Sequence, residues 1–245
     1  MNQFKVSALK YRPKEFEDVI GQKPITDTLE KSIKTSQLAQ ALLFCGPRGV
    51  GKTTCARILS KKINSDTISA NDFSYNIFEL DAASNNSVED IRRLIDQVRI
   101  PPQSGLYKVY IIDEAHMLST SAFNAFLKTL EEPPKYVIFI LATTEKNKIL
   151  PTILSRCQIF EFKRIGLLDI KNYLIKISKE NEVKYEENAL QIIAEKADGA
   201  LRDALSIYDQ MCSFCELNLT EISISKNLNL LSRSVFIEIT NKIIN

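Results

Sequence analysis

A glycine-rich loop, Gly46-Pro-Arg-Gly-Val-Gly-Lys-Thr53, constrains the fold of this chain more than any other stretch, because it fits the pattern GxxxxGK[ST]. It directly follows an apolar run, Ala41 to Cys45, and directly precedes a helical pattern from Lys52 to Ile63. Three of the seven glycines of the chain lie in it, where backbone N–H groups wrap around phosphates and a Cβ would obstruct the turn. The sequence therefore predicts a strand, a phosphate-binding loop and a helix in succession.

The polar side chains of this loop predict how a nucleotide is held. Lys52 is expected to bind the β- and γ-phosphates and Thr53 a Mg²⁺ ion, while the N-terminus of the following helix adds partial positive charge. A chance glycine-rich turn is the alternative, and the strand and helix on either side argue against it. The predicted nucleotide contacts of the loop are Gly46, Pro47, Arg48, Gly49, Val50, Gly51, Lys52, Thr53 and Thr54.

Two acidic residues, Asp113-Glu114, end a second apolar run, Val109-Tyr-Ile-Ile112. An acidic pair at a strand end is often a solvated turn, but a nucleotide-hydrolysing loop requires such a pair as its second element. Asp113 is expected to bind Mg²⁺ through water, and Glu114 to polarise the attacking water. We therefore predict a hydrolase and not only a nucleotide binder.

Short apolar runs alternate with helical periodicity along the first two thirds of the chain, which indicates an α/β fold with a parallel sheet covered by helices. After about Lys163 the strand signal ends and the pattern is helical, which predicts a second, small helical domain. We expect domains at 1–164 and 165–220, then a region at 221–245 with a last helix over Ser234 to Ile244. The predicted strands are Ala41–Cys45, Ile77–Leu80, Val109–Ile112, Val137–Ala142 and Gln158–Phe162, and further predicted helices are Ser87–Val98 and Ser119–Glu131.

Several other polar residues have two interpretations from the sequence alone. Thr143-Thr144 follows a predicted strand. One interpretation is that a side chain of this pair contacts the γ-phosphate or the attacking water, and the other is that the pair caps a helix. From the residues alone, Arg156 and Arg202 are interpreted as exposed surface arginines. His116 is the single histidine, which excludes a histidine pair or a histidine-rich metal site, and we interpret it as a structural residue beside Asp113-Glu114.

Composition excludes several classes of protein. With 44% hydrophobic and 25% charged residues over 245 positions, the chain is not predominantly disordered. A net charge of +2 does not by itself indicate a nucleic-acid protein, so any such contact must be local. No apolar run approaches the roughly 20 residues that span a bilayer. Five cysteines, an odd number, favour reduced thiols, so we expect a cytoplasmic protein without membrane contact.

Ordered motifs along nearly the whole chain together resemble one family, the gamma/tau ATPase subunit of the bacterial clamp loader of DNA polymerase III, an AAA+ protein. The motifs are Lys10-Tyr-Arg-Pro-Lys14, Phe16-Glu-Asp-Val-Ile-Gly-Gln22, Gly46 to Thr54, Asp81-Ala-Ala-Ser84, Val88-Glu-Asp90, Ile111-Ile-Asp-Glu-Ala-His-Met-Leu-Ser119, Leu127-Lys-Thr-Leu-Glu-Glu-Pro-Pro134, Leu141-Ala-Thr-Thr144, Leu154-Ser-Arg-Cys157 and Leu201-Arg-Asp-Ala-Leu205.

The resemblance implies an AAA+ P-loop NTPase with a five-stranded parallel sheet, followed by a helical lid, that uses ATP and Mg²⁺. It implies that Tyr11, Arg12 and the stretch Val19 to Gln22 line the adenine side. Thr143-Thr144 would be the sensor-1 region and Arg202 would be the sensor-2 arginine. Arg156 would reach into the ATP site of a neighbouring subunit as an arginine finger, so that hydrolysis depends on assembly.

The implied function is loading of a sliding clamp onto primed DNA within the DNA polymerase III holoenzyme. The implied partners are delta, delta-prime and further gamma/tau copies, the sliding clamp and primed DNA. A link to DNA-directed DNA polymerase is by association, because the two-metal carboxylate constellation of a polymerase is not apparent in this chain. Candidate phosphate contacts for DNA are Ser84, Asn85, Asn86, Ser87, Arg92 and Arg93.

Two departures from the family qualify the resemblance. Its bacterial members usually carry a four-cysteine zinc module after the phosphate-loop helix, whereas 64–76 holds no cysteine, so we predict no zinc. The family also continues into a helical collar domain that forms the oligomer. In this sequence about twenty residues follow the predicted second domain, so the sequence does not predict whether this chain forms a pentamer.

Three other functions remain as alternatives. A non-hydrolysing delta-prime-like subunit needs neither the intact loop nor Asp113-Glu114. A small subunit of the archaeal or eukaryotic clamp loader usually has Gly-Asp-Met-Arg where this chain has Gly-Ala-Leu-Arg202. A nucleotide-responsive DNA-binding module that no longer loads clamps is the third.

Overall fold

The computed structural model describes residues 6–64, 76–103, 105–228 and 242. They form two compact units, one of residues 13–163 and the other of the described residues up to Arg12 and from Arg164 onward. The sequence pattern predicts residues 1–12 in the sheet domain, whereas in the structure α1 (Ser7–Lys10) packs in the second unit. There the Ser7 N–H donates to Asp209 Oδ2 at 2.7 Å, and the Ser7 hydroxyl donates to the same carboxylate.

A five-stranded, all-parallel sheet forms the centre of the first unit, in the order β2-β3-β4-β1-β5. The inner strands β1, β3 and β4 consist almost wholly of buried residues, which is what a parallel sheet covered on both faces requires. The predicted α/β class and five strands are confirmed. Their bounds are β1 Ala41–Cys45, β2 Ile77–Asp81, β3 Lys108–Asp113, β4 Val137–Thr143 and β5 Gln158–Glu161.

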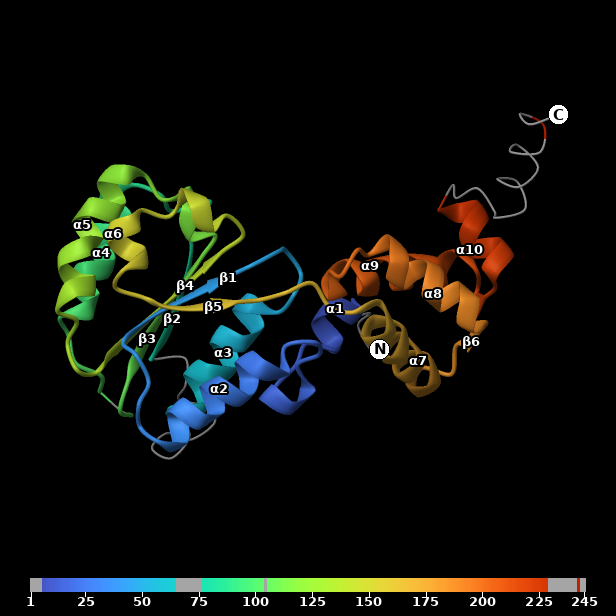
Figure 1. Cartoon of the computed structure of the whole chain (residues 1–245), viewed down its shortest axis with the longest axis horizontal. Helices are drawn as coiled ribbons and strands as arrows, with labels where there is room; N and C mark the ends of the chain where they lie inside the picture. Colours follow the sequence, from blue (N-terminus) through green and yellow to red (C-terminus); the bar gives the residue numbers. More distant parts are fainter. Residues whose placement is uncertain (1–5, 65–75, 104, 229–241, 243–245) are drawn as a thin grey trace. The chain divides into compact units, whose positions relative to one another are not determined.

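Helices cover both faces of this sheet (Figure 1). On one face lie α2 (Lys23–Lys34) and α3 (Lys52–Lys62), and on the other α4 (Val88–Val98), α5 (Thr120–Glu131) and α6 (Pro151–Leu154). The described part of this unit also contains three 3₁₀ turns, η1 (Phe16–Asp18), η3 (Ala115–Met117) and η4 (Lys146–Lys148).

Alternate strand residues feed the two hydrophobic cores, because successive side chains of a strand point to opposite faces. Leu42 and Phe44 of β1 pack with α3, whereas Leu43 packs with α4 and α5. Phe139 of β4 meets Phe126 of α5 edge to face, with ring centroids 4.9 Å apart. Burying such side chains contributes about 1.5–3 kcal/mol each, so these two layers hold the strand ends in place.

Side chains cap the ends of α4 and α5. Ser87 and Asp90 form a capping box at the start of α4, and the Ser119 hydroxyl accepts from the Ala122 N–H at the start of α5. At its other end α4 is closed by the buried Lys108, whose Nζ donates to the Ile100 carbonyl at 2.8 Å and to the Gln97 carbonyl at 3.1 Å.

The second unit is helical, as predicted, with its core on α7, α8 and α9. The expectation that strands end after Lys163 was wrong for two short strands, β6 and β7, which pair in parallel. With two residues each, they are too short to leave a periodic signal. The bounds are α7 Leu167–Glu180, β6 Lys184–Tyr185, α8 Glu187–Lys196, α9 Leu201–Phe214, β7 Asn218–Leu219 and α10 Glu221–Asn227.

The C-terminal helix predicted over Ser234 to Ile244 lies outside the described residues apart from Lys242. Within the described part of the chain, no helix has both the length and the apolar character needed to cross a membrane.

Candidate nucleotide-binding site

The backbone of the glycine-rich loop takes a shape that requires glycine. Gly46, Gly49 and Gly51 have φ angles of +146°, +74° and +102°, values that L-residues rarely adopt. A Cβ on Gly46 would lie 2.3 Å from the carbonyl oxygen of Phe162, which follows β5. The loop is therefore fixed both by its own turn and by the neighbouring strand end.

Lys52, the first residue of α3, folds back over this loop. Its Nζ donates to the Gly46 carbonyl at 2.8 Å and to the Pro47 carbonyl at 2.7 Å. Burial lowers the pKa of Lys52, and the carboxylates of Glu114 and Asp113 oppose that shift by favouring the charged form. The ammonium thus stands over the loop, held by acceptors that a phosphate oxygen can replace.

Thr53 and Asp113 come from different elements and meet directly. The Thr53 hydroxyl donates to Asp113 Oδ2 at 2.8 Å, while Asp113 Oδ1 accepts from the Glu114 N–H at 3.0 Å. A hydroxyl and a carboxylate side by side fit Mg²⁺, which prefers oxygen ligands and keeps several waters. These are the two metal-binding residues predicted from the sequence.

Glu114 takes a left-handed backbone conformation, with φ of +48°, directly after β3. Its Oε2 accepts from the Thr144 hydroxyl at 3.2 Å, so residues that follow β3 and β4 are joined. The structure therefore brings together Lys52, Thr53, Asp113, Glu114 and Thr144, as predicted, at the carboxyl ends of three adjacent strands.

The side chain of Gln22 links the stretch Val19 to Gln22 to the glycine-rich loop. Its side-chain amide donates to the Lys163 carbonyl at 2.7 Å and to the Val50 carbonyl at 3.5 Å. Val19 approaches Gly51 from the same stretch, 3.9 Å from the position of a Cβ there. The segment assigned by resemblance to the adenine side therefore does border the phosphate loop.

Asp81 organises the candidate DNA loop, a role that the sequence did not reveal. Its carboxylate accepts from the Ala83 N–H at 2.9 Å and from the Ser84 hydroxyl at 3.2 Å, and its carbonyl accepts from the Asn85 amide at 3.1 Å. Asp81 is also the register partner of Asp113, so this loop leaves the sheet beside the predicted metal residues.

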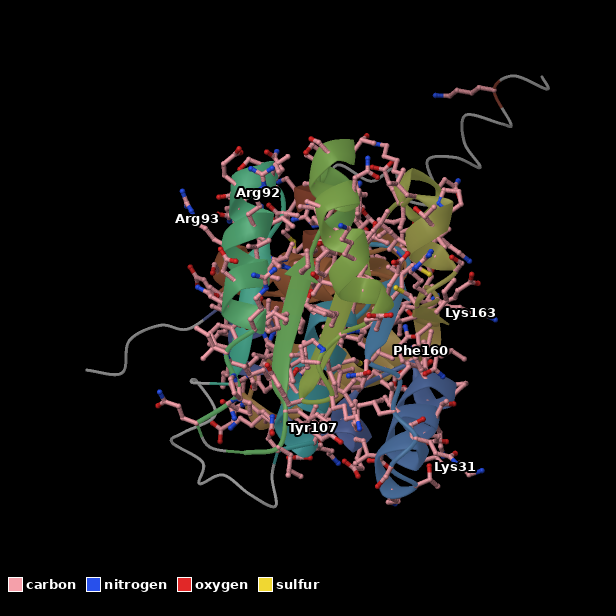
Figure 2. All side chains as sticks on the ribbon, turned by 90° about the vertical axis from the view of Figure 1, so that its left-hand side faces the viewer. Lys31, Arg92, Arg93, Tyr107, Phe160 and Lys163 are labelled. Atoms are coloured by element: carbon pink, nitrogen blue, oxygen red, sulfur yellow. The ribbon has the colours of Figure 1, made fainter. Side chains whose placement is uncertain are left out.

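Of the other candidate DNA residues, Asn86, Arg92 and Arg93 are exposed and Ser87 is half-buried. Figure 2 shows Arg92 and Arg93 on α4, with Arg93 reaching away from the helix. Arg93 Nη1 lies 3.8 Å from Asp90 Oδ1, a loose pair on an exposed surface.

Arg156 is exposed just after α6, and its guanidinium rests on its own chain. Nη2 lies 2.6 Å from Glu131 Oε1, and Nη1 donates to the Thr152 carbonyl at 2.6 Å. Glu131 is a partner that the sequence did not predict, because it is far from Arg156 along the chain.

Tyr11, Arg12 and Arg202 belong to the other compact unit. The Tyr11 hydroxyl donates to Asn181 Oδ1 at 3.0 Å, and the Tyr11 carbonyl accepts from the Tyr173 hydroxyl at 3.2 Å. Arg202 is exposed at the second residue of α9. Their roles toward a nucleotide stay predictions.

The phosphate loop after β1 and the acidic pair after β3, with β4 between them in the sheet, define an AAA+ P-loop NTPase fold followed by a helical lid. Solved structures of RuvB from Thermotoga maritima have a similar fold. One of them is titled as a Holliday junction branch migration motor. That one has a TM-score of 0.69 at 20% identity, over 89% of this chain and 72% of RuvB, which shows the fold alone.

Family models narrow the class. The model described as DNA polymerase III, delta subunit matches residues 21–166, and the model described as DNA polymerase III clamp loader subunit, ATPase lid domain matches residues 169–216. The tau subunit of DNA polymerase III from Bacillus subtilis is 49% identical over 83% of this chain and 39% of its own length. The gamma subunit from Buchnera aphidicola subsp. Baizongia pistaciae is 40% identical over 99% of this chain and 69% of its own length.

The chain therefore belongs to the gamma/tau family of bacterial DNA polymerase III subunits. It spans 39% of the length of the Bacillus subtilis relative and 34% of the Escherichia coli tau subunit.

Proposed function

We propose that this chain is the ATP-hydrolysing subunit of a bacterial replicative clamp loader, which loads a sliding clamp onto primed DNA within the DNA polymerase III holoenzyme in the cytoplasm. The observation that carries the proposal is the meeting of Lys52, the Thr53–Asp113 pair and the Glu114–Thr144 pair at one edge of the sheet. A subunit that only supports the assembly needs none of these contacts.

Each residue of this set has a separate task in the proposed reaction. Lys52 exchanges the loop carbonyls for the β- and γ-phosphate oxygens of ATP, and Glu114 orients the attacking water. Thr53 and Asp113 hold Mg²⁺, which neutralises charge that develops on the phosphates. Thr144 restrains the Glu114 carboxylate through the hydroxyl contact. Tyr11 and Arg12 on the adenine side, and Arg202 as sensor 2, complete the proposed site.

Arg156 acts in the site of a neighbouring copy. An exposed guanidinium bound to one carboxylate, one carbonyl and the Ser155 hydroxyl keeps further N–H donors for a phosphate, since it has five in all. Such an arginine supplied in trans stabilises charge on the transferred phosphoryl group, so hydrolysis waits for assembly. The proposed assembly contains delta, delta-prime and further gamma/tau copies.

Primed DNA is the proposed second ligand. The short polar residues from Ser84 to Ser87 stand at the N-terminus of α4, where backbone N–H groups and hydroxyls suit phosphate oxygens. Arg92 and Arg93 add positive charge on the first turns of that helix. Replacing Asn85 and Asn86 by Ala should weaken DNA-stimulated hydrolysis and spare the basal rate; unchanged stimulation contradicts this assignment.

A delta-prime-like structural subunit is the second candidate, because the family model that matches residues 21–166 is described as a delta subunit. The two candidates differ in one measurable property, hydrolysis itself. The prediction that the protein holds no zinc rests on the stretch 64–76, which lies outside the described residues except at its ends, and stoichiometric zinc in the purified protein would contradict it.

Steady-state ATP hydrolysis decides between the candidates. It is measured for the protein alone and then with delta, delta-prime, sliding clamp and primed DNA, with Lys52→Ala as the inactive control and Arg156→Ala as the finger variant. Stimulation by the partners that disappears in Arg156→Ala supports the proposal. Basal hydrolysis without stimulation contradicts the role of assembly, and no hydrolysis under any condition supports the structural subunit.

A further inference from the structure

The single histidine of the chain, His116, is enclosed by polar groups from two strand ends. It stands in η3, three residues after Asp113, and its side chain is 8% exposed. Its Nδ1 lies 3.1 Å from Thr143 Oγ1 and 3.5 Å from Glu114 Oε2, and its Nε2 lies 3.3 Å from Glu145 Oε1. A buried ring with a partner on each nitrogen has a defined orientation.

The neighbours of the ring favour a proton on one of its two nitrogens. A hydrogen bond from Lys148 keeps the pKa of Glu145 below its usual value, and the carboxylate, whose Oε1 lies 3.3 Å from Nε2, favours a proton on that nitrogen. Thr143 Oγ1 accepts from the Glu145 N–H at 3.0 Å, and its own proton is available for donation to Nδ1 when Nε2 carries the ring proton. The tautomer with the proton on Nε2 fits both contacts.

This tautomer restricts the carboxylate of Glu114. Nδ1 then presents a lone pair toward Glu114 Oε2, so their approach of 3.5 Å is between two acceptors. The carboxylate oxygen cannot form a hydrogen bond with the ring and takes one from the Thr144 hydroxyl, at 3.2 Å. The ring therefore limits Glu114 on one side while Thr144 holds it on the other.

The same ring is one step from the phosphate loop. The carbonyl of Thr143 accepts from the Gly46 N–H at 3.2 Å, so Thr143 contacts the loop with its backbone and the ring with its side chain. A continuous set of contacts thus runs from the phosphate loop through Thr143 and His116 to Glu114.

We propose that His116 is a positioning residue for Glu114, which keeps this carboxylate in the orientation that polarises water and links it through Thr143 to the phosphate loop. The inference rests on the proposed function, since it takes Glu114 as the residue that orients the water. His116 itself touches neither nucleotide nor water in this role.

Two substitutions separate positioning from a purely structural role. His116→Asn places a polar group near the position of Nδ1 and keeps the contact with Thr143, whereas His116→Gln reaches the position of Nε2 and keeps only the contact with Glu145. In the full chain assembled with its companion subunits, we expect kcat to fall less than about threefold in His116→Asn and about tenfold or more in His116→Gln. The KM for ATP and the affinity for a fluorescent ATP analogue should change less than about twofold in both.

A structural role predicts the opposite order. Asn is smaller than Gln and leaves more of the buried ring volume empty, so it would be the more damaging substitution. Equal kcat values in the two variants, or a lower kcat in His116→Asn, would overturn the proposal.

Glu145→Gln tests the tautomer without changing the buried ring, because the Glu145 side chain is 47% exposed. An amide both donates and accepts, so it no longer places the proton on Nε2. We expect kcat to fall severalfold with nucleotide affinity unchanged, and a wild-type kcat contradicts the proposed tautomer. Glu114→Gln separates the two proposals: hydrolysis at the wild-type rate in this variant refutes the assignment of Glu114, whereas an inactive Glu114→Gln with wild-type His116→Gln refutes only the role of His116.

Discussion

Replacing Gly46 by Ala should destabilise the sheet unit more than the same change at Gly51, although both glycines lie in one loop and both have positive φ. A Cβ at position 46 would stand 2.3 Å from the Phe162 carbonyl oxygen, whereas at position 51 the nearest atom is Val19 Cγ1 at 3.9 Å. The pair therefore separates steric overlap from backbone strain.

The structure sets the size of this difference. Backbone strain at such φ values costs about 1–3 kcal/mol for an L-residue, and both variants carry it. Real Cβ atoms stay beyond 3.0 Å, so in Gly46→Ala the loop and the Phe162 carbonyl must separate by a further 0.7 Å, the difference between 3.0 and 2.3 Å. Overpacking of this kind typically costs about 1–3 kcal/mol more. Against a usual total of about 5–15 kcal/mol, Gly46→Ala should leave the unit marginally stable.

Hydrogen exchange on the two variants measures this directly. Because the chain has two compact units, amides of β1 and β5 report the opening free energy of the sheet unit alone. We expect Gly46→Ala to open more easily than Gly51→Ala by about 1–3 kcal/mol. Opening free energies that agree within about 0.5 kcal/mol would refute the argument from the Phe162 contact.

Three further predictions follow from single contacts. Burial raises the pKa of the Cys157 thiol from 9.0 to about 11, so the unfolded chain loses this proton first and the free energy of unfolding should fall between about pH 9 and 11. The slope is at most about 1.4 kcal/mol per pH unit, and urea titrations of Cys157→Ala should show a smaller one. Ser87→Ala removes the capping box of α4 and should lower the free energy of unfolding by about 0.5–2 kcal/mol in urea, with Ser87→Thr as the conservative control. Glu131→Gln should change partner-stimulated hydrolysis less than about fivefold, since an exposed ion pair with Arg156 contributes about 1 kcal/mol or less, and a loss as large as that of Arg156→Ala would contradict this.

The fold was predictable wherever a local pattern decided it. The runs that became β1, β3 and β4 are apolar on both faces, and the serine caps of α4 and α5 precede clear helical periods. The pair β6 and β7 was missed because a strand of two residues has no period, and it forms only once α8 and α9 bring its halves together. The placement of α1 in the second unit likewise depends on Asp209, far along the chain from Ser7.

The candidate site likewise contains residues that the sequence predicted and contacts that it did not. Lys52, Thr53, Asp113 and Glu114 were predictable because each stands at a fixed offset from a strand end. The partners that orient them were not, since they meet only across the sheet. Thr144 and Glu114 follow different strands, and nothing in either motif shows that their side chains touch.

Sheet order explains why these unpredicted contacts gather around Glu114. β4 lies between the strand that precedes the phosphate loop and the strand that ends in the acidic pair, so its carboxyl end provides a route from one to the other beside the direct contact of Thr53 with Asp113. That end carries Thr143, whose carbonyl binds the Gly46 N–H and whose hydroxyl binds His116. A change in the loop when it binds phosphate can therefore reach the residues that hold Glu114 through Thr143. On this view the strand between the two motifs is one element that ties water activation to the presence of nucleotide, and substitutions at its carboxyl end should alter kcat more than nucleotide affinity.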